Sequence, residues 1–236
     1  HDIEITSFND APVNELNVVK AMENVNIKGV VNDYDIHDVS FNGYVYVKMF
    51  DNKSNYSTLN NEGSGSHDYS CYKDVLFEGK ATIIDGSFDI SFNIPRSVNF
   101  QGNNARISFY AVDTVRDVMA NGCFADLFVD GVADVNIDDS GPEIECEWTD
   151  MPDSGGTLSV AFYDPQGVMH YDSSIGRDVI LIHESPSEVV YENLNSNFEP
   201  AADDFTRGSV NKTFTCLENG LHRFTVKAWD THDNVS

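Results

Sequence analysis

The sequence has few basic residues and no long apolar segment. It contains 14 lysines and arginines against 39 aspartates and glutamates, which gives a formal net charge of −25. Such a negative field repels nucleic acid and anionic lipid, so nucleic-acid binding is excluded. The charge is typical of a solvated surface on a secreted protein, and it is also compatible with binding of a cation or a basic partner. No apolar run has the length of a transmembrane helix, so direct membrane insertion is not expected.

Signatures of several enzyme classes are missing as well. There is no C-x-x-C pair to indicate a zinc or redox site, no G-x-S-x-G turn of a serine hydrolase, and no glycine-rich phosphate loop. A Cys–His pair such as Cys123 and His170 would require two distant parts of the chain to converge. We therefore expect no catalytic residue in this chain.

Cysteine is scarce, but the number of cysteines is even. The four are Cys71, Cys123, Cys146 and Cys216. Strand alternation places Cys146 on the same inward face as Trp148, and Cys216 close to an inward Phe214, which favours a Cys146–Cys216 disulfide in an oxidising compartment. Cys71–Cys123 is the other candidate pair. The alternative is that each cysteine is a reduced, small hydrophobic residue.

What the sequence has in abundance is the alternation typical of β-strands. From Ser87 to Ile94 every second side chain is apolar, which is the pattern of a half-buried strand. Gly86 provides the turn before this strand, and Pro95 ends its hydrogen bonding because proline lacks a backbone N–H. Only residues 12–23 have the composition of a short helix, and residues 52–68 are expected to form a long exposed loop.

Similar runs recur along the chain, separated by clusters of Gly, Asn, Asp and Ser. The predicted strands are Asn26–Val31, Gly43–Phe50, Gly79–Ile84, Ser87–Ile94, Ala105–Val112, Cys123–Val129, Glu143–Trp148, Thr157–Tyr163, Asp178–His183, Glu188–Glu192, Ser209–Leu217 and Leu221–Trp229. A polar break at residues 134–142 divides them into domains at residues 1–139 and 140–236. We predict an all-β fold of two tandem β-sandwiches, the first jelly-roll-like and the second immunoglobulin-like.

Calcium is the candidate cofactor, because the ion prefers clustered oxygen ligands on tight loops. Asp134, Asn136 and Asp138 have the spacing of an EF-hand loop, but Asp139 occupies the position that requires glycine, so an EF-hand is rejected. A looser site at the domain junction would use four aspartates: Asp138, Asp139, Asp230 and Asp233. The alternative is that these are solvated linker and turn residues. A second acidic cluster spans residues 33–38.

Several motifs together resemble one protein family. They are G-x-F-x-x-x-F-x-I-P-R at Gly86–Arg96, RISFYAVD at Arg106–Asp113, the FNGYVYVKMFD segment from Phe41, the Gly155-Gly156 turn, the AFYDPQGVMHYDSSIGRDVIL segment from Ala161 and LENGLHRFTVKAWD at Leu217–Asp230. Their order and spacing, across residues 25–234, resemble the β region that follows the catalytic domain in the gingipain-like signal peptidases, or sortases, of the Bacteroidetes type IX secretion system (PorU-type). The chain departs from the family pattern at two positions. Arg177 stands where histidine is common in the family, and Val168 stands where isoleucine is common.

The resemblance implies a role without catalysis in this chain, since the family's Cys–His pair belongs to the preceding domain. The family's last motif is followed by one more strand, which implies that the last sheet here lacks an edge strand or borrows one. His1 in place of an initiator methionine predicts a piece of a longer protein. The expected partners are the parent's own peptidase domain and a protein partner or secreted cargo, at the outer-membrane surface of a Gram-negative bacterium. The rival hypotheses are a carbohydrate- or host-binding adhesin module and a structural spacer.

Overall fold

The structure is a computed structural model that describes residues 1–13, 17–63, 65–98, 104–136, 139–152, 155–171 and 176–236. Its regular elements are strands, apart from one short 3₁₀ helix, η1 (Asn195–Asn197), within these ranges. Among the described residues, no helix has the length and apolar character needed to cross a membrane. The predicted all-β class is therefore confirmed.

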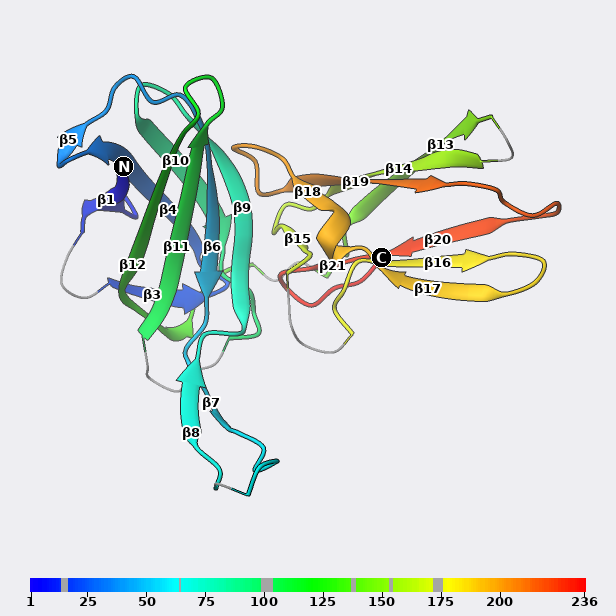
Figure 1. Cartoon of the computed structure of the whole chain (residues 1–236), viewed down its shortest axis with the longest axis horizontal. Helices are drawn as coiled ribbons and strands as arrows, with labels where there is room; N and C mark the ends of the chain where they lie inside the picture. Colours follow the sequence, from blue (N-terminus) through cyan, green and yellow to red (C-terminus); the bar gives the residue numbers. More distant parts are fainter. Residues whose placement is uncertain (14–16, 64, 99–103, 137–138, 153–154, 172–175) are drawn as a thin grey trace.

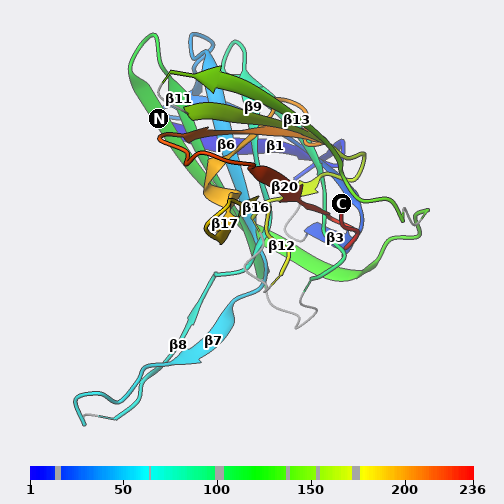
Figure 2. The same cartoon turned by 90° about the vertical axis from the view of Figure 1, so that its right-hand side faces the viewer.

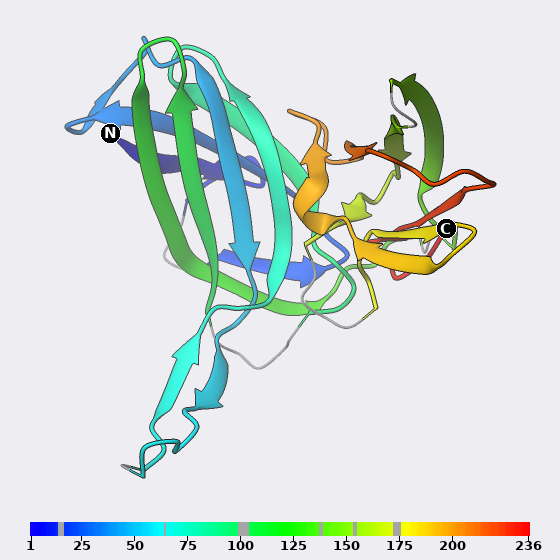
Figure 3. The same ribbon diagram turned by 45° about the vertical axis from the view of Figure 1, so that its right-hand side comes forward.

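The first half of the chain forms one curved sheet. The strands along its main path, in chain order, are β1 (Asp2–Phe8), β4 (Asn24–Asp33), β6 (Gly43–Phe50), β9 (Val75–Ile83), β10 (Ser87–Asn93), β11 (Asn104–Asp113) and β12 (Val118–Val132). Their order across the sheet is β10-β4-β1-β12-β11-β6-β9, and three short strands join it at the side: β2 (Ala11–Pro12), β3 (Asn17–Ala21) and β5 (Ile36–His37). The sheet curls until its two end strands, β9 and β10, come together (Figures 1 and 3).

Strand alternation explains the core that this curl encloses. In β4, β6, β9, β10 and β11, every second side chain is buried and apolar, and these side chains fill one continuous core. Phe77 and Phe92 stack at its centre with ring centroids 4.0 Å apart. The Asp85–Gly86 turn that joins β9 to β10 has positive φ at both residues, and Ile84 and Ser87 exchange both backbone hydrogen bonds across it. This is the hairpin turn that an Asp-Gly pair favours.

The second half forms a smaller sandwich. One sheet has the order β13-β14-β19-β18 and the other has the order β17-β16-β20. Their bounds are β13 (Glu143–Met151), β14 (Gly155–Tyr163), β16 (Ile180–Glu184), β17 (Val189–Asn193), β18 (Phe198–Pro200), β19 (Arg207–Phe214) and β20 (Arg223–Lys227); a two-stranded ladder of β15 (Val168–Met169) and β21 (Trp229–Asp230) lies beside them. Leu158, Phe162, Leu181 and Val210 belong to the buried core between the sheets. Figure 2 shows this half from its outer end.

Two expectations about local structure were wrong. Residues 17–21 form strand β3, which pairs in parallel with β12, although their composition suggested a short helix. Their burial alternates, with Val19 and Ala21 buried, so tertiary pairing overrides local preference here. The expected loop at residues 52–68 contains half of a hairpin, β7 (Ser54–Ser57) with β8 (Asp68–Cys71), which projects away from the sheet (Figures 1 and 3).

Candidate functional site

The two halves are joined by a compact set of contacts between β9 and the segment that follows β18. Asp203 has a positive φ of 64°, and this conformation directs its backbone and its side chain toward β9. Its N–H donates to the Lys80 carbonyl at 3.0 Å. Its carboxylate accepts hydrogen bonds from the Thr82 backbone N–H at 2.7 Å and from the Thr82 hydroxyl at 2.6 Å. We use the term joint for these contacts of Asp203 with Lys80 and Thr82, together with the contacts around His170 described next.

His170 lies at the centre of the joint and is 7% exposed. Its ring stacks on Phe198 with centroids 4.1 Å apart, and it meets Tyr171 edge-on. Nε2 lies 3.2 Å from the Glu78 carbonyl oxygen, so this nitrogen carries a proton and donates it. Burial lowers the pKa of His170 to about 4, because a charged imidazole would lose its water there. The side chain is therefore neutral at physiological pH.

Polar contacts continue on either side of His170. The Asn93 side chain donates to the Gln166 carbonyl and to the Gln166 side-chain oxygen, both at 3.1 Å. The Arg96 N–H donates to the Thr231 carbonyl at 2.8 Å. The cavity among these residues has a volume of about 20 Å³, which is room for about one water molecule. The joint is thus a packed interface that holds the second sandwich against the curved sheet.

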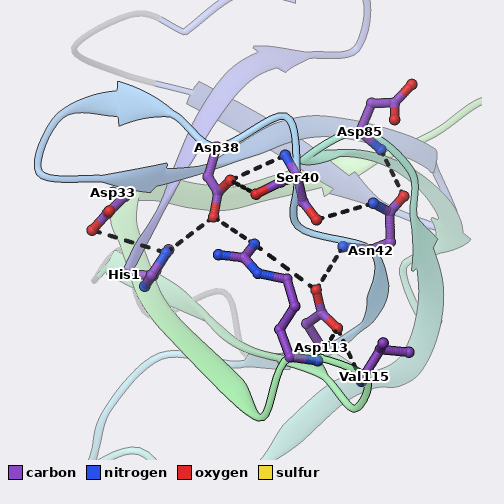
Figure 4. A network of polar contacts seen from close by, with 9 residues as sticks. His1, Asp33, Asp38, Ser40, Asn42, Asp85, Asp113 and Val115 are labelled. Atoms are coloured by element: carbon purple, nitrogen blue, oxygen red, sulfur yellow. Dashed lines mark hydrogen bonds and ion pairs between the residues drawn. The ribbon is translucent and has the colours of Figure 1, made fainter.

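A second polar network lies at one end of the curved sheet (Figure 4). Asp113 is 1% exposed and accepts hydrogen bonds from the backbone N–H groups of Asn42, Val115 and Arg116. The donors, led by the Arg116 N–H, lower the pKa of Asp113. Asp38 accepts from the Ser40 hydroxyl at 2.5 Å and from the Arg116 guanidinium at 2.9 Å, and the Ser40 hydroxyl makes the largest contribution to lowering its pKa. The acidic cluster at residues 33–38 is therefore partly neutralised by an arginine.

The aspartates predicted to bind calcium have separate roles where the structure describes them. Asp230 is buried, and its carboxylate accepts hydrogen bonds from the N–H groups of His232 and Asn234 and from the Asn234 side chain. Burial raises the pKa of Asp230, and those hydrogen bonds oppose the shift. Asp233 forms an ion pair with Arg177 at 3.1 Å, and Asp139 is exposed. Asp138 lies outside the described residues. Among the described residues, no group of three or more His, Cys, Asp or Glu side chains is placed to hold a metal ion. The calcium site stays a prediction.

All four cysteines are free thiols in the structure. Cys146, Cys216 and Cys123 are exposed, and Cys71 is half-buried at the base of the β7–β8 hairpin. Neither expected disulfide, Cys146–Cys216 or Cys71–Cys123, is present. Strand alternation placed Cys146 on the face that carries Ile144 and Trp148, but Cys146 is exposed there, while Ile144 packs against the core of the second sandwich. Partial burial raises the pKa of the Cys146 thiol.

Beside the joint, a shallow groove of about 400 Å³ runs between the outer face of β6, β9 and β11 and strand β18. Tyr46 and Tyr110 are cross-strand partners, each a little under half exposed, with ring centroids 6.3 Å apart. Lys48 and Glu78 form an ion pair at 2.8 Å within the same groove. The groove combines aromatic faces with charged and hydroxyl groups, a lining that is suited to binding.

Few features of the sequence predict the contacts of the joint. Asp203 lies in a segment without strand or turn periodicity, and Thr82 is one of several outward threonines in strands. The sequence suggests His170 only as a partner of Cys123, but its ring contacts aromatic rings and a carbonyl oxygen. Only the folded chain brings residues 80–82 and 202–203 together, as the bridge between Lys80 and Ala202 shows.

No protein-family model and no curated protein sequence matches the chain. Among solved structures, the crystal structure of dimeric latent PorU from Porphyromonas gingivalis matches 100% of this chain with 26% identity and a TM-score of 0.60. The chain is similar to a part of PorU. It covers 23% of the PorU structure, so the likeness concerns one region of that protein.

Two further matches are much weaker. The native conformation of α2-macroglobulin from E. coli matches 98% of this chain and 14% of its own length, with 11% identity and a TM-score of 0.33. The sporulation control protein Spo0M from Bacillus subtilis matches 96% of this chain and 89% of its own, with 9% identity and a TM-score of 0.30. Neither carries an argument about function, and the PorU-like relationship stands on the first match.

Proposed function

We propose that this chain is a non-catalytic accessory region of a secreted, gingipain-like cysteine peptidase of the type IX secretion system. In this role, two joined β-sandwiches support the peptidase domain and contact a protein partner or the secreted cargo at the outer surface of the bacterium. The observation that carries the proposal is the likeness to PorU over the whole chain, with 26% identity. The motifs that resemble PorU-type peptidases lie in both halves, so they support the same relationship.

The joint supports a scaffold role on physical grounds. Domains linked by a small polar interface usually move relative to each other. Here, the hydrogen bond between His170 and the Glu78 carbonyl, a bridge between Lys80 and Ala202, and the hydrogen bonds of Asp203 hold the second sandwich against the curved sheet. A fixed pair of sandwiches can present loops at a constant spacing to a peptidase domain or a partner. The net charge of −25 keeps such a surface soluble outside the cell.

The direct test is to determine the sequence encoded before residue 1 and to measure whether the domain found there binds this chain. We expect an α/β domain with a histidine and a cysteine at strand ends, and a complex with this chain when the two are produced separately and mixed. A glycosidase or a series of further sandwiches at that position would overturn the proposal.

The groove beside the joint favours one alternative, a carbohydrate-binding module. An exposed aromatic pair next to charged and hydroxyl groups is the type of surface on which sugar rings stack. Tyr46 and Tyr110 supply the rings, and Ser108 and Lys48 lie in the same groove. A glycan array would decide this function. Binding that is lost in Tyr46→Ala and Tyr110→Ala, and kept in Tyr191→Ala on the exposed strand β17, would support it.

A further inference from the structure

Two histidines lie side by side at the outer end of the second sandwich. His183 is near the end of β16, and His222 comes directly before β20. The register of β16 with β20 places His183 opposite Phe224, and His222 is two residues from Phe224, so the three side chains share one face of the sheet. Here the β16–β17 turn meets the loop between β19 and β20, on the side away from the curved sheet (Figure 1).

The ring nitrogens of these two histidines face each other. Nε2 of His183 lies 2.9 Å from Nδ1 of His222, and the rings stack with centroids 5.1 Å apart and planes 28° apart. Nε2 of His222 lies 2.9 Å from the Glu218 carbonyl oxygen. Because a carbonyl oxygen only accepts, this nitrogen carries a proton, and Nδ1 of His222 directs a lone pair toward His183. Nε2 of His183 therefore donates the hydrogen bond between the rings.

The orientation of His222 is that of a histidine that binds a metal ion. Such a histidine usually donates its other ring N–H to a carboxylate or a backbone carbonyl, which fixes the tautomer and turns the lone pair toward the ion. The Glu218 carbonyl has this role here. Two imidazole nitrogens bound at about 2.0–2.1 Å lie about 2.9 Å apart at a right angle and about 3.3 Å apart in a tetrahedral site. The observed separation of 2.9 Å therefore requires little movement to admit an ion.

His183 is held in position by aromatic rings. Its imidazole stacks on Phe224 with centroids 4.5 Å apart and meets Phe214 edge-on at 5.4 Å, while Phe224 in turn stacks on Trp148 at 5.2 Å. Burial, and next the neighbouring His222, lowers the pKa of His183, so its ring is neutral and able to bind a cation. When an ion binds, the proton on Nε2 of His183 moves to Nδ1 of the same ring. Both imidazoles then stay neutral, and the ion takes the place of the hydrogen bond between them.

The two segments that carry the histidines are tied to each other. The Glu218 carboxylate accepts hydrogen bonds from the Ser187 N–H at 3.0 Å and from the Ser187 hydroxyl at 2.7 Å. The Ser187 hydroxyl makes the largest contribution to lowering the pKa of Glu218, so this carboxylate is charged at neutral pH. Pro186 packs on Gly220, where an added Cβ atom would lie 2.4 Å from the proline ring. The histidine pair is thus positioned before an ion binds, beside a negative charge that attracts cations.

We propose that His183 and His222 together bind one divalent transition-metal ion of the group that prefers imidazole: Zn²⁺, Ni²⁺ or Cu²⁺. The two facing nitrogens are the protein ligands. Among the described residues no third His, Cys, Asp or Glu side chain joins them, so water fills the remaining positions. Calcium is not the expected ion, because it prefers oxygen ligands. The proposal does not depend on the accessory role described above.

Calorimetric titration of the whole chain with Ni²⁺ and with Zn²⁺ tests the site. The buffer contains excess Mg²⁺ to occupy surface carboxylates, because the chain has a net charge of −25. We expect an ion to bind the parent chain, and we expect His183→Gln and His222→Gln each to weaken this binding at least about tenfold. His67→Gln is the matched control, because His67 is exposed in a loop of the other half, and it should bind the ion as the parent does.

The variant that lacks both histidines separates one shared ion from two independent contacts. If both rings bind the same ion, the double variant should lose less binding free energy than the sum of the two single losses. Ni²⁺ or Zn²⁺ should also raise the thermal midpoint of the parent and not that of the double variant, and a chelator should reverse the rise. Melting in chelator confirms that each variant is folded. Unchanged binding in His183→Gln and His222→Gln, or losses that simply add, would contradict a shared site.

Discussion

Asp203 binds Thr82 through both of its carboxylate oxygens, one on the backbone N–H at 2.7 Å and the other on the hydroxyl at 2.6 Å. Thr82 lies in the curved sheet and Asp203 in the second sandwich, so these bonds join the two halves of the chain. The positive φ of Asp203 places its side chain for this contact. Aspartate is one of the few residues that adopts this conformation at low cost while also accepting hydrogen bonds.

Replacing Asp203 with alanine should loosen the joint. We expect the free energy of unfolding to fall by about 1 to 2 kcal/mol, because two accepted hydrogen bonds are lost and alanine is strained at positive φ. Asp203→Asn should lose less, since asparagine tolerates the same backbone and keeps an acceptor. Urea denaturation of both variants, with Glu199→Ala of β18 as a control, measures the effect. An alanine variant as stable as the parent would show that the contact does not hold the sandwiches together.

His170 should make stability depend on pH. Its pKa is about 4 in the folded chain, against an ordinary value near 6.5. Between these values only the unfolded chain binds the proton, so protonation favours unfolding. The contribution of a neutral His170 is therefore fully present above pH of about 6.5 and is lost as the pH falls toward about 4, with a total of about 3 kcal/mol.

The His170→Gln variant isolates this contribution from the many carboxylates. Glutamine keeps a donor for the Glu78 carbonyl but does not titrate in this range. The difference in unfolding free energy between the parent and the variant, measured by denaturant titration at several pH values, should change steeply between pH of about 6.5 and 4 and be flat above that window. A difference that is constant with pH would mean that His170 is hydrated in the folded chain.

Gly156, which the structure places in strand β14 and not in a turn, should be intolerant of a side chain because of Trp148. A Cβ atom at Gly156 would lie 2.1 Å from the indole ring, which is a severe overlap. Gly156→Ala should therefore displace the ring from Phe224 and cost about 1 to 3 kcal/mol, with a change in tryptophan fluorescence. A double-mutant cycle gives the control: in a Trp148→Ala background the same glycine substitution should cost much less. Equal costs in the two backgrounds would place the strain elsewhere.

Strand positions were largely predictable, and the contacts between strands were not. Alternation located β6 at Gly43–Phe50 and β10 within one residue, because each has one buried face. It also assigned Cys146 and Trp148 to an inward face, but it carries no information on whether a facing strand covers that face. The joint could not be predicted from the sequence, because the hydrogen-bond partners of Asp203 and His170 lie far away along the chain. Alternation in the sequence shows which side chains of a strand share a face, but only the folded structure shows which of these faces pack against each other.

The projecting β7–β8 hairpin should be dispensable for stability. A two-stranded hairpin is marginally stable alone, and this one is held mainly by its own contacts, such as the stacked rings of Tyr56 and Tyr69 with centroids 5.7 Å apart. Replacing residues 55–70 with a two-glycine turn should leave the thermal midpoint of the chain within about 2 °C of the parent. Limited proteolysis of the parent should cut first within this hairpin. A large fall in the midpoint would show instead that the hairpin packs on the curved sheet and belongs to its core.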